Sequence, residues 1–399
     1  MYTPSQNVLK KYADVLVKFA LNSGKGIKKG EVVYLVTQTP GIPLAKEVYR
    51  AVLEKGGHVL LNILDDDFKL MFVEQASKQQ LSFFPEKYYK GIADTVDHWV
   101  RILADKDPMF LKNADPKKVM LSNQANRPFR QWLDQKEDRG EFTWTLCLYG
   151  TEGNAKEAGM SLQAYWNQIK KACFLNEADP LKKWRSVHTQ MQKVIDKLNS
   201  MPIDRVHVEA KETDIWIKIG ERRKWLGGSG RNIPSFEIFT SPDWRGTEGK
   251  IYFDLPLYRY GNIIKDIRLE FKNGKIVKAT ASENEKFLKE MIKQKNADKI
   301  GEFSLTDTRF SKISEVMADT LYDENFGGKY GNTHLAVGKS YHDTYDGDLS
   351  KISEEQLEEL GFNHSVEHTD IISSSDRLVT AVMKDGTEKV IYRKGKFTL

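Results

Sequence analysis

The chain has 399 residues, of which 40% are hydrophobic, 29% charged and 11% aromatic, a composition that indicates a globular fold and excludes extensive disorder. Its formal charge of +5 is the balance of 61 basic and 56 acidic residues, so the charges are intermixed and do not imply nucleic-acid binding. No apolar run approaches the roughly 20 residues that span a bilayer, and the N-terminus lacks the apolar segment of a secretion signal, so we expect no membrane insertion.

The two cysteines, Cys147 and Cys173, each lie in an apolar stretch. Their spacing matches no CxxC redox or zinc motif. We therefore expect two buried free thiols, which suits a reducing compartment, and predict a cytoplasmic location.

The first half of the chain alternates helix and strand patterns. Apolar residues at intervals of three and four predict an amphipathic helix over 9–20. Residues 32–36 and 58–64 are apolar strands separated by a helical stretch over 43–55, and this strand–helix–strand unit predicts a parallel sheet. The pattern continues with strands expected over 96–103 and 142–149 and helices over 116–135 and 160–174.

The pattern of apolar and polar residues changes near residue 200, after a helical stretch over 179–199. Alternating apolar and polar residues then predict strands over 206–210 and 215–219, and Asn273-Gly274 and Asp385-Gly386 predict two hairpins. We therefore expect an α/β N-terminal domain with an open parallel sheet over residues 1–200. An α+β domain with a mostly antiparallel sheet should follow over residues 201–399.

Two of the eight histidines stand in patterns that suit a metal site. His368 and Asp370 are separated by one residue in a short strand, so both side chains point to the same face. His334 follows a glycine-rich loop and an acidic stretch, where a phosphate cradle is a poor interpretation because acids repel phosphate. The other six histidines need only packed or solvated positions.

Glu237 and Glu302 each stand within an apolar, strand-like run, where a carboxylate is costly unless it is paired or bound to a metal. Taken singly, each of these residues is also compatible with an exposed strand edge. Together, two histidines and three carboxylates form the mixed ligand set that suits zinc, cobalt or manganese. Two adjacent ions could hold a bridging hydroxide nucleophile, polarise a carbonyl and stabilise the oxyanion, as amide hydrolysis requires.

The motifs resemble those of the thermophilic metallo-aminopeptidase family, which includes aminopeptidases T and S. The resemblance rests on NIPSFE with FTSP, Gly301-Glu302, LYDEN, HLAVGKSY and His368-Thr369-Asp370, in that order along the chain. It covers the second half strongly, and the N-terminal helix and strand–helix–strand opening are consistent with it.

The resemblance implies a metal-dependent aminopeptidase with two divalent ions, peptide substrates that have a free N-terminus, and a homodimer. It implies metal ligands at Glu237, Glu302, His334, His368 and Asp370. Glu302 would be the bridging, catalytic carboxylate, and Tyr341 an active-site phenol that can hydrogen-bond the tetrahedral intermediate.

Two departures from the family pattern bear on substrate preference. Phe236 stands where the family has glycine before the first glutamate. After the HxD pair the family has an apolar pair and glycine, whereas here Ile371-Ile372 leads to Ser373-Ser374-Ser375. All proposed ligands are nevertheless present, which favours an active enzyme with altered preference.

Two other functions remain open at this point. A non-catalytic metal-binding homologue that acts as an interaction protein would keep the fold and the ions. A nucleic-acid binder is suggested only by the pI near 8.8 and by the basic run over 221–225, which a charged turn explains equally well. For an aminopeptidase, Glu324 or Asp323 could bind the substrate amine, although either could instead cap a helix.

Overall fold

The computed structural model describes residues 2–259 and 261–399, and the chain divides into two compact units. The first unit comprises Met1–Arg185 and Ser229–Pro234, and the second comprises Ser186–Gly228 and Ser235–Leu399. The division into domains at residue 200 stays a proposal, because compactness alone does not show independent folding.

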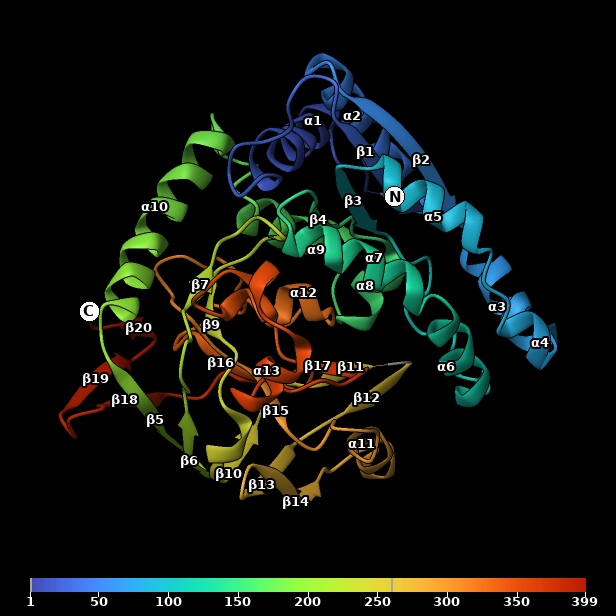
Figure 1. Cartoon of the computed structure of the whole chain (residues 1–399). Helices are drawn as coiled ribbons and strands as arrows, with labels where there is room; N and C mark the ends of the chain where they lie inside the picture. The colour runs from blue at the N-terminus through green and yellow to red at the C-terminus, as the bar shows by residue number, and fades with distance from the viewer. Residues whose placement is uncertain (1, 260) are drawn as a thin grey trace. The chain divides into compact units, whose positions relative to one another are not determined.

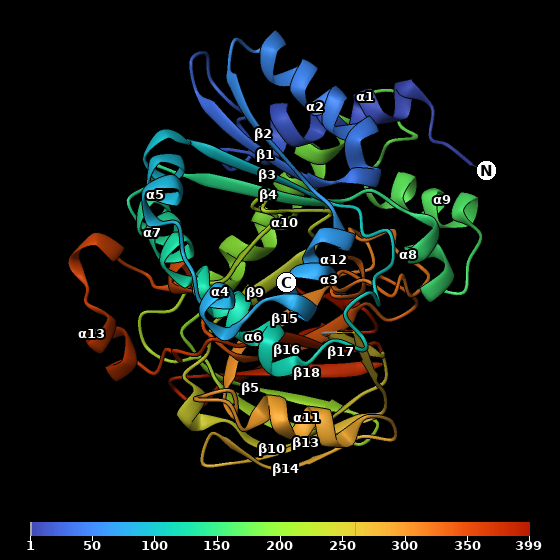
Figure 2. The same cartoon turned by 90° about the vertical axis from the view of Figure 1, so that its right-hand side faces the viewer.

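The first unit is built on a five-stranded parallel sheet, as the strand–helix–strand pattern predicted (Figures 1 and 2). The strand order is β2-β1-β3-β4-β8. The strands are β1 (Val32–Gln38), β2 (His58–Leu64), β3 (His98–Leu103), β4 (Thr143–Leu148) and β8 (Asn232–Ile233). β2 forms one edge, so much of its apolar surface is exposed, for example at Leu61 and Ile63.

Helices cover both faces of this sheet, with α1 and α2 on one face and α5 and α7 on the other (Figure 2). The α5 and α7 face carries an aromatic and aliphatic core that includes Tyr34, Phe129 and Leu133. The helices are α1 (Gln6–Val15, continued by a π-helical turn over Leu16–Ala20), α2 (Ile42–Glu54), α3 (Asp66–Gln75), α4 (Lys78–Leu81), α5 (Glu86–Thr95), α6 (Pro116–Ala125), α7 (Arg127–Asp138), α8 (Glu152–Glu157) and α9 (Leu162–Ala172).

The helix expected over 116–135 is two helices. α6 ends before Asn126 and α7 begins after it. Pro128, in the first turn of α7, has no N–H to continue the preceding hydrogen-bond ladder, which accounts for the break.

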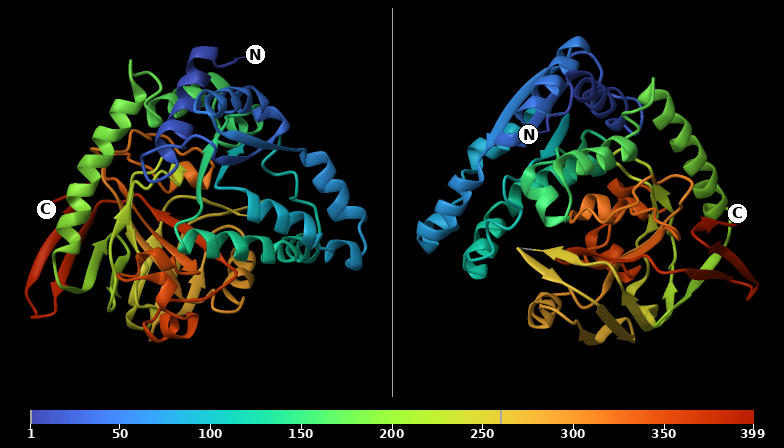
Figure 3. Two further views of the ribbon diagram at one scale, coloured as in Figure 1. Left: turned by 45° about the horizontal axis from the view of Figure 1, so that its top comes forward. Right: turned by 180° about the vertical axis from the view of Figure 1, so that it is seen from behind.

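The second unit begins within the helix α10 (Pro180–Asn199) and contains two antiparallel sheets and one small hairpin (Figures 1 and 3). The larger sheet has the order β14-β13-β10-β6-β5-β18-β19-β20 and includes both hairpins that the turn residues predicted. Its strands are β5 (Ile203–Ala210), β6 (Thr213–Lys218), β10 (Glu248–Phe253), β13 (Ile267–Lys272), β14 (Lys275–Thr280), β18 (Arg377–Met383), β19 (Glu388–Arg393) and β20 (Lys396–Phe397).

The smaller sheet has the order β17-β16-β15-β9-β7, with all of its pairings antiparallel. Its strands are β7 (Leu226–Gly227), β9 (Glu237–Thr240), β15 (Ile300–Thr306), β16 (Asn332–Gly338) and β17 (His368–Ser373). The remaining elements of this unit are the hairpin β11 (Leu257–Arg259) and β12 (Asn262–Ile264) and the helices α11 (Glu285–Ile292), α12 (Thr320–Asp323) and α13 (Glu354–Glu359). Every residue of β15 and β16 is buried, so both faces of this sheet are covered.

Both cysteines are buried free thiols, as expected. Among the described residues, no helix combines the length and apolar character needed to cross a membrane.

Candidate metal centre

Polar residues alternate with apolar ones along the central strands of the smaller sheet. β15 reads Glu302-Phe303-Ser304-Leu305-Thr306, so its glutamate, serine and threonine share one face and its apolar side chains the other. Both faces are buried. The apolar face packs in the hydrophobic core, and the polar side chains on the other face need hydrogen-bond, ionic or metal partners.

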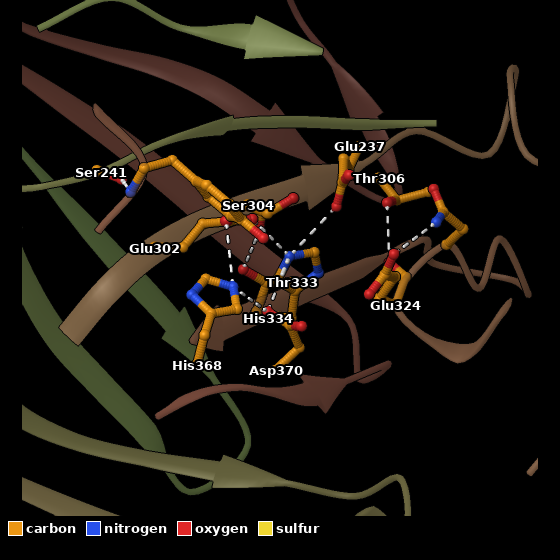
Figure 4. Close-up of polar contacts among 12 residues, drawn as sticks. Glu237, Ser241, Glu302, Ser304, Thr306, Glu324, Thr333, His334, His368 and Asp370 are labelled. Carbon is orange, nitrogen blue, oxygen red and sulfur yellow. Dashed lines mark hydrogen bonds and ion pairs between the residues drawn. The ribbon is translucent and has the colours of Figure 1, made fainter. Parts of the chain in front are cut away.

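Strand register places the predicted ligands on that polar face. Ala336 of β16 pairs with Glu302 on one side and with Asp370 on the other. Ser304 pairs with His334, two residues along the same face. The remaining predicted ligands fall on this face through the pairs Thr306 with Glu237 and Gly338 with His368. Four strands therefore contribute the five side chains, which Figure 4 shows turned toward one another.

A β-bulge sets the position of Glu302. The register shifts between Ile300 and Glu302, and Gly301 lies within the shift. A Cβ at Gly301 would lie 2.2 Å from the carbonyl oxygen of Lys339, so only glycine permits this close approach. Gly301 thus permits the bulge, and the bulge directs the carboxylate of Glu302 toward the other ligands.

The carboxylate of Glu302 lies between the two imidazoles. Its Oε1 is 3.0 Å from Nε2 of His334, and its Oε2 is 3.7 Å from Nε2 of His368. Asp370 Oδ1 lies 3.4 Å from His368 Nε2, and Glu237 Oε2 lies 3.4 Å from His334 Nε2. Each imidazole thus faces one oxygen of Glu302 and one oxygen of a second acid.

These side chains form two groups that could each hold an ion. Within the described residues, the groups are Glu237, Glu302 and His334, and Glu302, His368 and Asp370, with the ligand atoms of each group within 4.8 Å of one another. Glu302 is shared. Imidazole nitrogens with carboxylate oxygens are the donor set of zinc and of related divalent ions, so the residues present fit a pair of such ions.

The electrostatics of the cluster also favour a cation. Burial and the repulsion of Glu302 raise the pKa of Glu237 to about 8. Burial would raise the pKa of Asp370 too, but the adjacent His368 holds that pKa below its usual range. Three carboxylates buried at one point are costly without compensating positive charge.

A hydrogen bond from the ring nitrogen that faces away from the carboxylates orients the imidazole of His368. Its Nδ1 donates to the carbonyl oxygen of Lys339 at 2.8 Å, which leaves the Nε2 lone pair facing the carboxylates. Arg259 donates to Glu367 at 3.0 Å and to the carbonyl oxygen of His368 at 3.3 Å, so it ties the β11 hairpin to the ligand strand. Such orienting contacts are typical of metal-binding imidazoles.

Tyr341 lies beside the cluster. Its ring centroid is 4.6 Å from that of His368, and its backbone N–H donates to Ser241 Oγ at 2.8 Å. Burial, with repulsion from Glu302 and Asp370, raises the pKa of the Tyr341 phenol well above its usual value. The phenol therefore stays protonated and can donate a hydrogen bond.

Sequence reasoning did not single out several orienting residues. Ser241, which holds the backbone of Tyr341, belongs to the FTSP motif but has no charge to mark it. Arg259 lies on a short hairpin that carries little periodic signal. Ser304 lies on the same face of β15 as Glu302, as the alternation along that strand indicates, but among the described residues no contact of its hydroxyl orients a ligand.

The two departures from the family pattern lie at packed positions. Phe236 is fully buried, and its N–H donates to Asn325 Oδ1 at 2.5 Å. Ser374 donates from its backbone N–H and its hydroxyl to the two carboxylate oxygens of Asp254, at 2.6 and 2.8 Å, so the serine run anchors the end of β17.

The model of the thermophilic metalloprotease (M29) family matches residues 5–397. This chain belongs to that family. The membership confirms the resemblance inferred from the motifs, and it makes the chain a metal-dependent hydrolase of peptide bonds. Membership of a metalloprotease family implies a divalent metal cofactor, and the acidic and imidazole cluster of the smaller sheet is a candidate site for it.

Relatives match this M29 chain along nearly its whole length. Aminopeptidase PepS of Streptococcus thermophilus is 30% identical over 423 residues, which cover 98% of each chain. Aminopeptidase AmpS of Bacillus subtilis is 27% identical over 415 residues, which also cover 98% of each.

Among solved structures, wild-type AmpT from Thermus thermophilus matches with a TM-score of 0.85 and 23% identity, covering 99% of this chain and 100% of that one. The expected fold class, a parallel α/β part and a mostly antiparallel part, is confirmed. A 2,5-dihydroxypyridine dioxygenase from Pseudomonas putida KT2440 matches with a TM-score of 0.51 and 11% identity, covering 99% and 98%. Its different named chemistry illustrates that function must be argued from the site.

Proposed function

We propose that this chain is an aminopeptidase that uses two bound divalent ions to release N-terminal amino acids from peptides. The observation that carries the proposal is the placement of Glu302, whose two carboxylate oxygens face different imidazoles, 3.0 Å from His334 and 3.7 Å from His368. A carboxylate in that position is suited to bridging two ions. The aminopeptidase activity named for its M29 relatives supports the same reaction.

Glu237, Glu302 and His334 would hold one ion, and Glu302, His368 and Asp370 the other. Zinc, cobalt and manganese all suit this donor set. When bound, such a pair would supply a bridging hydroxide nucleophile, polarise the scissile carbonyl and stabilise the oxyanion.

The protein's own groups complete the chemistry. The protonated phenol of Tyr341 donates a hydrogen bond to the oxygen that becomes negative in the tetrahedral intermediate. Lys339, through its carbonyl, keeps the proton of His368 on Nδ1 and so keeps Nε2 available as a ligand. Burial of the cluster strengthens each of these interactions because it excludes water.

The test is hydrolysis of a peptide by protein that has been stripped with a chelator and then reloaded. We expect mass spectrometry to show stepwise loss of N-terminal residues with zinc, cobalt or manganese, and no loss in the stripped protein. An N-acetylated copy of the peptide should stay intact. Lack of cleavage with every metal would point to the non-catalytic homologue, and equal cleavage of the acetylated copy would point to an endopeptidase.

The homodimer and the cytoplasmic location stay predictions. Light scattering of the purified protein would give the oligomeric state, and fractionation of the source cells would give the location.

A further inference from the structure

The main chain of Tyr341 is held on both sides by neighbouring segments. Its N–H donates to Ser241 Oγ at 2.8 Å, and its carbonyl oxygen accepts the hydroxyl of Thr344 at 2.7 Å. The carbonyl oxygen of Thr344 in turn accepts the N–H of Lys224 at 2.8 Å. Ser241 is fully buried, and Figure 4 shows it on the Glu302 side of the ligand cluster. The direction of the Tyr341 phenol therefore depends on where these segments lie.

Arg223 connects the two ends of this series of hydrogen bonds. Its Nε donates to the carbonyl oxygen of Ser241 at 2.6 Å. Since Lys224 follows Arg223 directly, the hydrogen bonds close into a ring that contains the main chain of Tyr341. The arginine thus holds the residue to which the N–H of Tyr341 is bound.

The other donors of Arg223 reach two further carbonyl oxygens. Nη1 donates to the carbonyl of Glu221 at 2.8 Å, and Nη2 donates to the carbonyl of Leu360 at 2.9 Å. The guanidinium lies over the ring of Phe362, with Cζ 3.5 Å from the ring centroid. A planar guanidinium offers donors in several fixed directions, whereas the ammonium group of lysine is a compact charge on a flexible stem. Arginine therefore suits this position and lysine does not.

Arg223 is charged in this environment. Burial lowers its pKa to about 10, which leaves the guanidinium protonated at neutral pH. A charged donor makes a stronger hydrogen bond than a neutral one, and a cation over an aromatic ring is attracted to it. The bond to the carbonyl of Ser241 is therefore a firm restraint on that residue.

Arg222, one residue earlier, has different partners. It is exposed, donates from Nε and Nη2 to the carbonyl oxygen of Asp346 at 3.0 and 2.8 Å, and lies 5.0 Å from the ring centroid of Tyr345. The basic run over 221–225 thus contains two arginines that each donate to carbonyls and lie over an aromatic ring. Of the two, Arg223 is the one that donates to Ser241.

We propose that Arg223 is a positioning residue that sets the direction of the Tyr341 phenol through Ser241. The inference rests on the proposed aminopeptidase function, in which that phenol donates to the tetrahedral intermediate. Arg223 itself touches neither the candidate ligands nor the phenol in the hydrogen bonds described above, so its effect on the reaction passes through the main chain of Tyr341.

The first test is a double-mutant cycle on metal-loaded protein with leucine p-nitroanilide as substrate. Loss of the phenol in Tyr341→Phe should lower kcat by about 100-fold, and its misplacement in Arg223→Ala should lower kcat by about 30-fold. Metal content and KM should stay near the wild-type values. In the Tyr341→Phe background, Arg223→Ala should lower kcat by less than about threefold, because a phenol that is absent cannot be misplaced. An equal loss in both backgrounds would overturn the inference, since it indicates a general structural role.

Two further variants belong to this cycle. Arg222→Ala is the matched control and should keep the wild-type kcat, whereas a loss equal to that of Arg223→Ala would contradict the assignment to Arg223. Arg223→Lys keeps the charge but not the fork of donors, so its kcat should be as low as that of Arg223→Ala. If Arg223→Ala does not fold, Arg223→Lys takes its place in the cycle with the same expected result.

The second test measures the position of the phenol without catalysis. Protein that carries 3-fluorotyrosine at position 341 alone should give one narrow ¹⁹F resonance. Arg223→Ala should shift this resonance or split it, and Arg222→Ala should leave it unchanged. An unchanged resonance in Arg223→Ala would overturn the inference.

The two proposals fail separately. A wild type that cleaves no peptide with any metal, but whose ¹⁹F resonance responds to Arg223→Ala, would contradict the aminopeptidase function and leave the positioning role of Arg223 standing. A wild type that cleaves peptides, but in which Arg223→Ala changes neither kcat nor the resonance, would contradict the positioning role alone.

Discussion

Replacing Glu302 with glutamine removes the carboxylate that both candidate ion-binding groups share. Its oxygens lie 3.0 Å from His334 Nε2 and 3.7 Å from His368 Nε2. Opposite unit charges about 4 Å apart attract by about 4 kcal/mol at an effective dielectric constant of about 20. Loss of that attraction corresponds to a roughly thousandfold weaker Kd for metal.

The assay is thermal unfolding with and without added metal. At a metal concentration of about 100 times the wild-type Kd, binding stabilises the folded protein by about 2.7 kcal/mol. For a unit of this size that corresponds to a rise in Tm of roughly 5–10 °C. A thousandfold weaker Kd reduces the stabilisation to about 0.1 kcal/mol, so the Tm of Glu302→Gln should not respond measurably to the same metal.

Asp243→Asn is the matched control for this experiment. Asp243 is a buried acid of the same unit that is held by Arg245 at 2.7 Å and belongs to neither ion-binding group. The control should have a lower Tm than the wild type, and added metal should raise its Tm by the full wild-type amount. If added metal raises the Tm of Glu302→Gln as much as it raises the Tm of the wild type, Glu302 does not have the shared role.

Three further predictions concern neighbouring residues. Tyr341→Phe should lower kcat about 100-fold with metal content and KM unchanged, and a rise in KM instead would indicate a binding role. Burial and the nearby His364 lower the pKa of His342 to about 4 from 6.5, so the folded protein binds fewer protons than the unfolded chain between these values and should lose stability as the pH falls through that window. His342→Phe should remove about 3 kcal/mol of this dependence in denaturant unfolding, and an unchanged slope would contradict the assignment. Phe236→Leu should cost about 1–2 kcal/mol in unfolding and leave the preferred N-terminal residues unchanged in a peptide panel, since Phe236 is fully buried, whereas a changed preference would place it in the substrate site.

The sequence predicted the members of the candidate site but not their arrangement. Glu237 and Glu302 were recognisable because a carboxylate within an apolar strand needs a partner. Their meeting with His334 depends on the register of three strands, and a shift of one residue would turn a ligand to the opposite face. Register is set by long-range pairing and by the bulge at Gly301, neither of which is visible in local periodicity.

The fold was predictable where periodicity is strong. The parallel and antiparallel parts followed from apolar runs and from period-two alternation. β8, at Asn232–Ile233, was missed because a two-residue strand has no period, although it completes the parallel sheet of the first unit. The exposure of β2 also could not be foreseen, since it follows from the edge position of that strand.

The most direct test of the account is a titration of metal-free protein with zinc or cobalt, with the bound metal per chain and the release of N-terminal amino acids measured on the same samples. The account predicts that activity rises until two ions are bound per chain and then stays constant. Full activity with one ion, or activity that persists in protein shown to hold none, would contradict it.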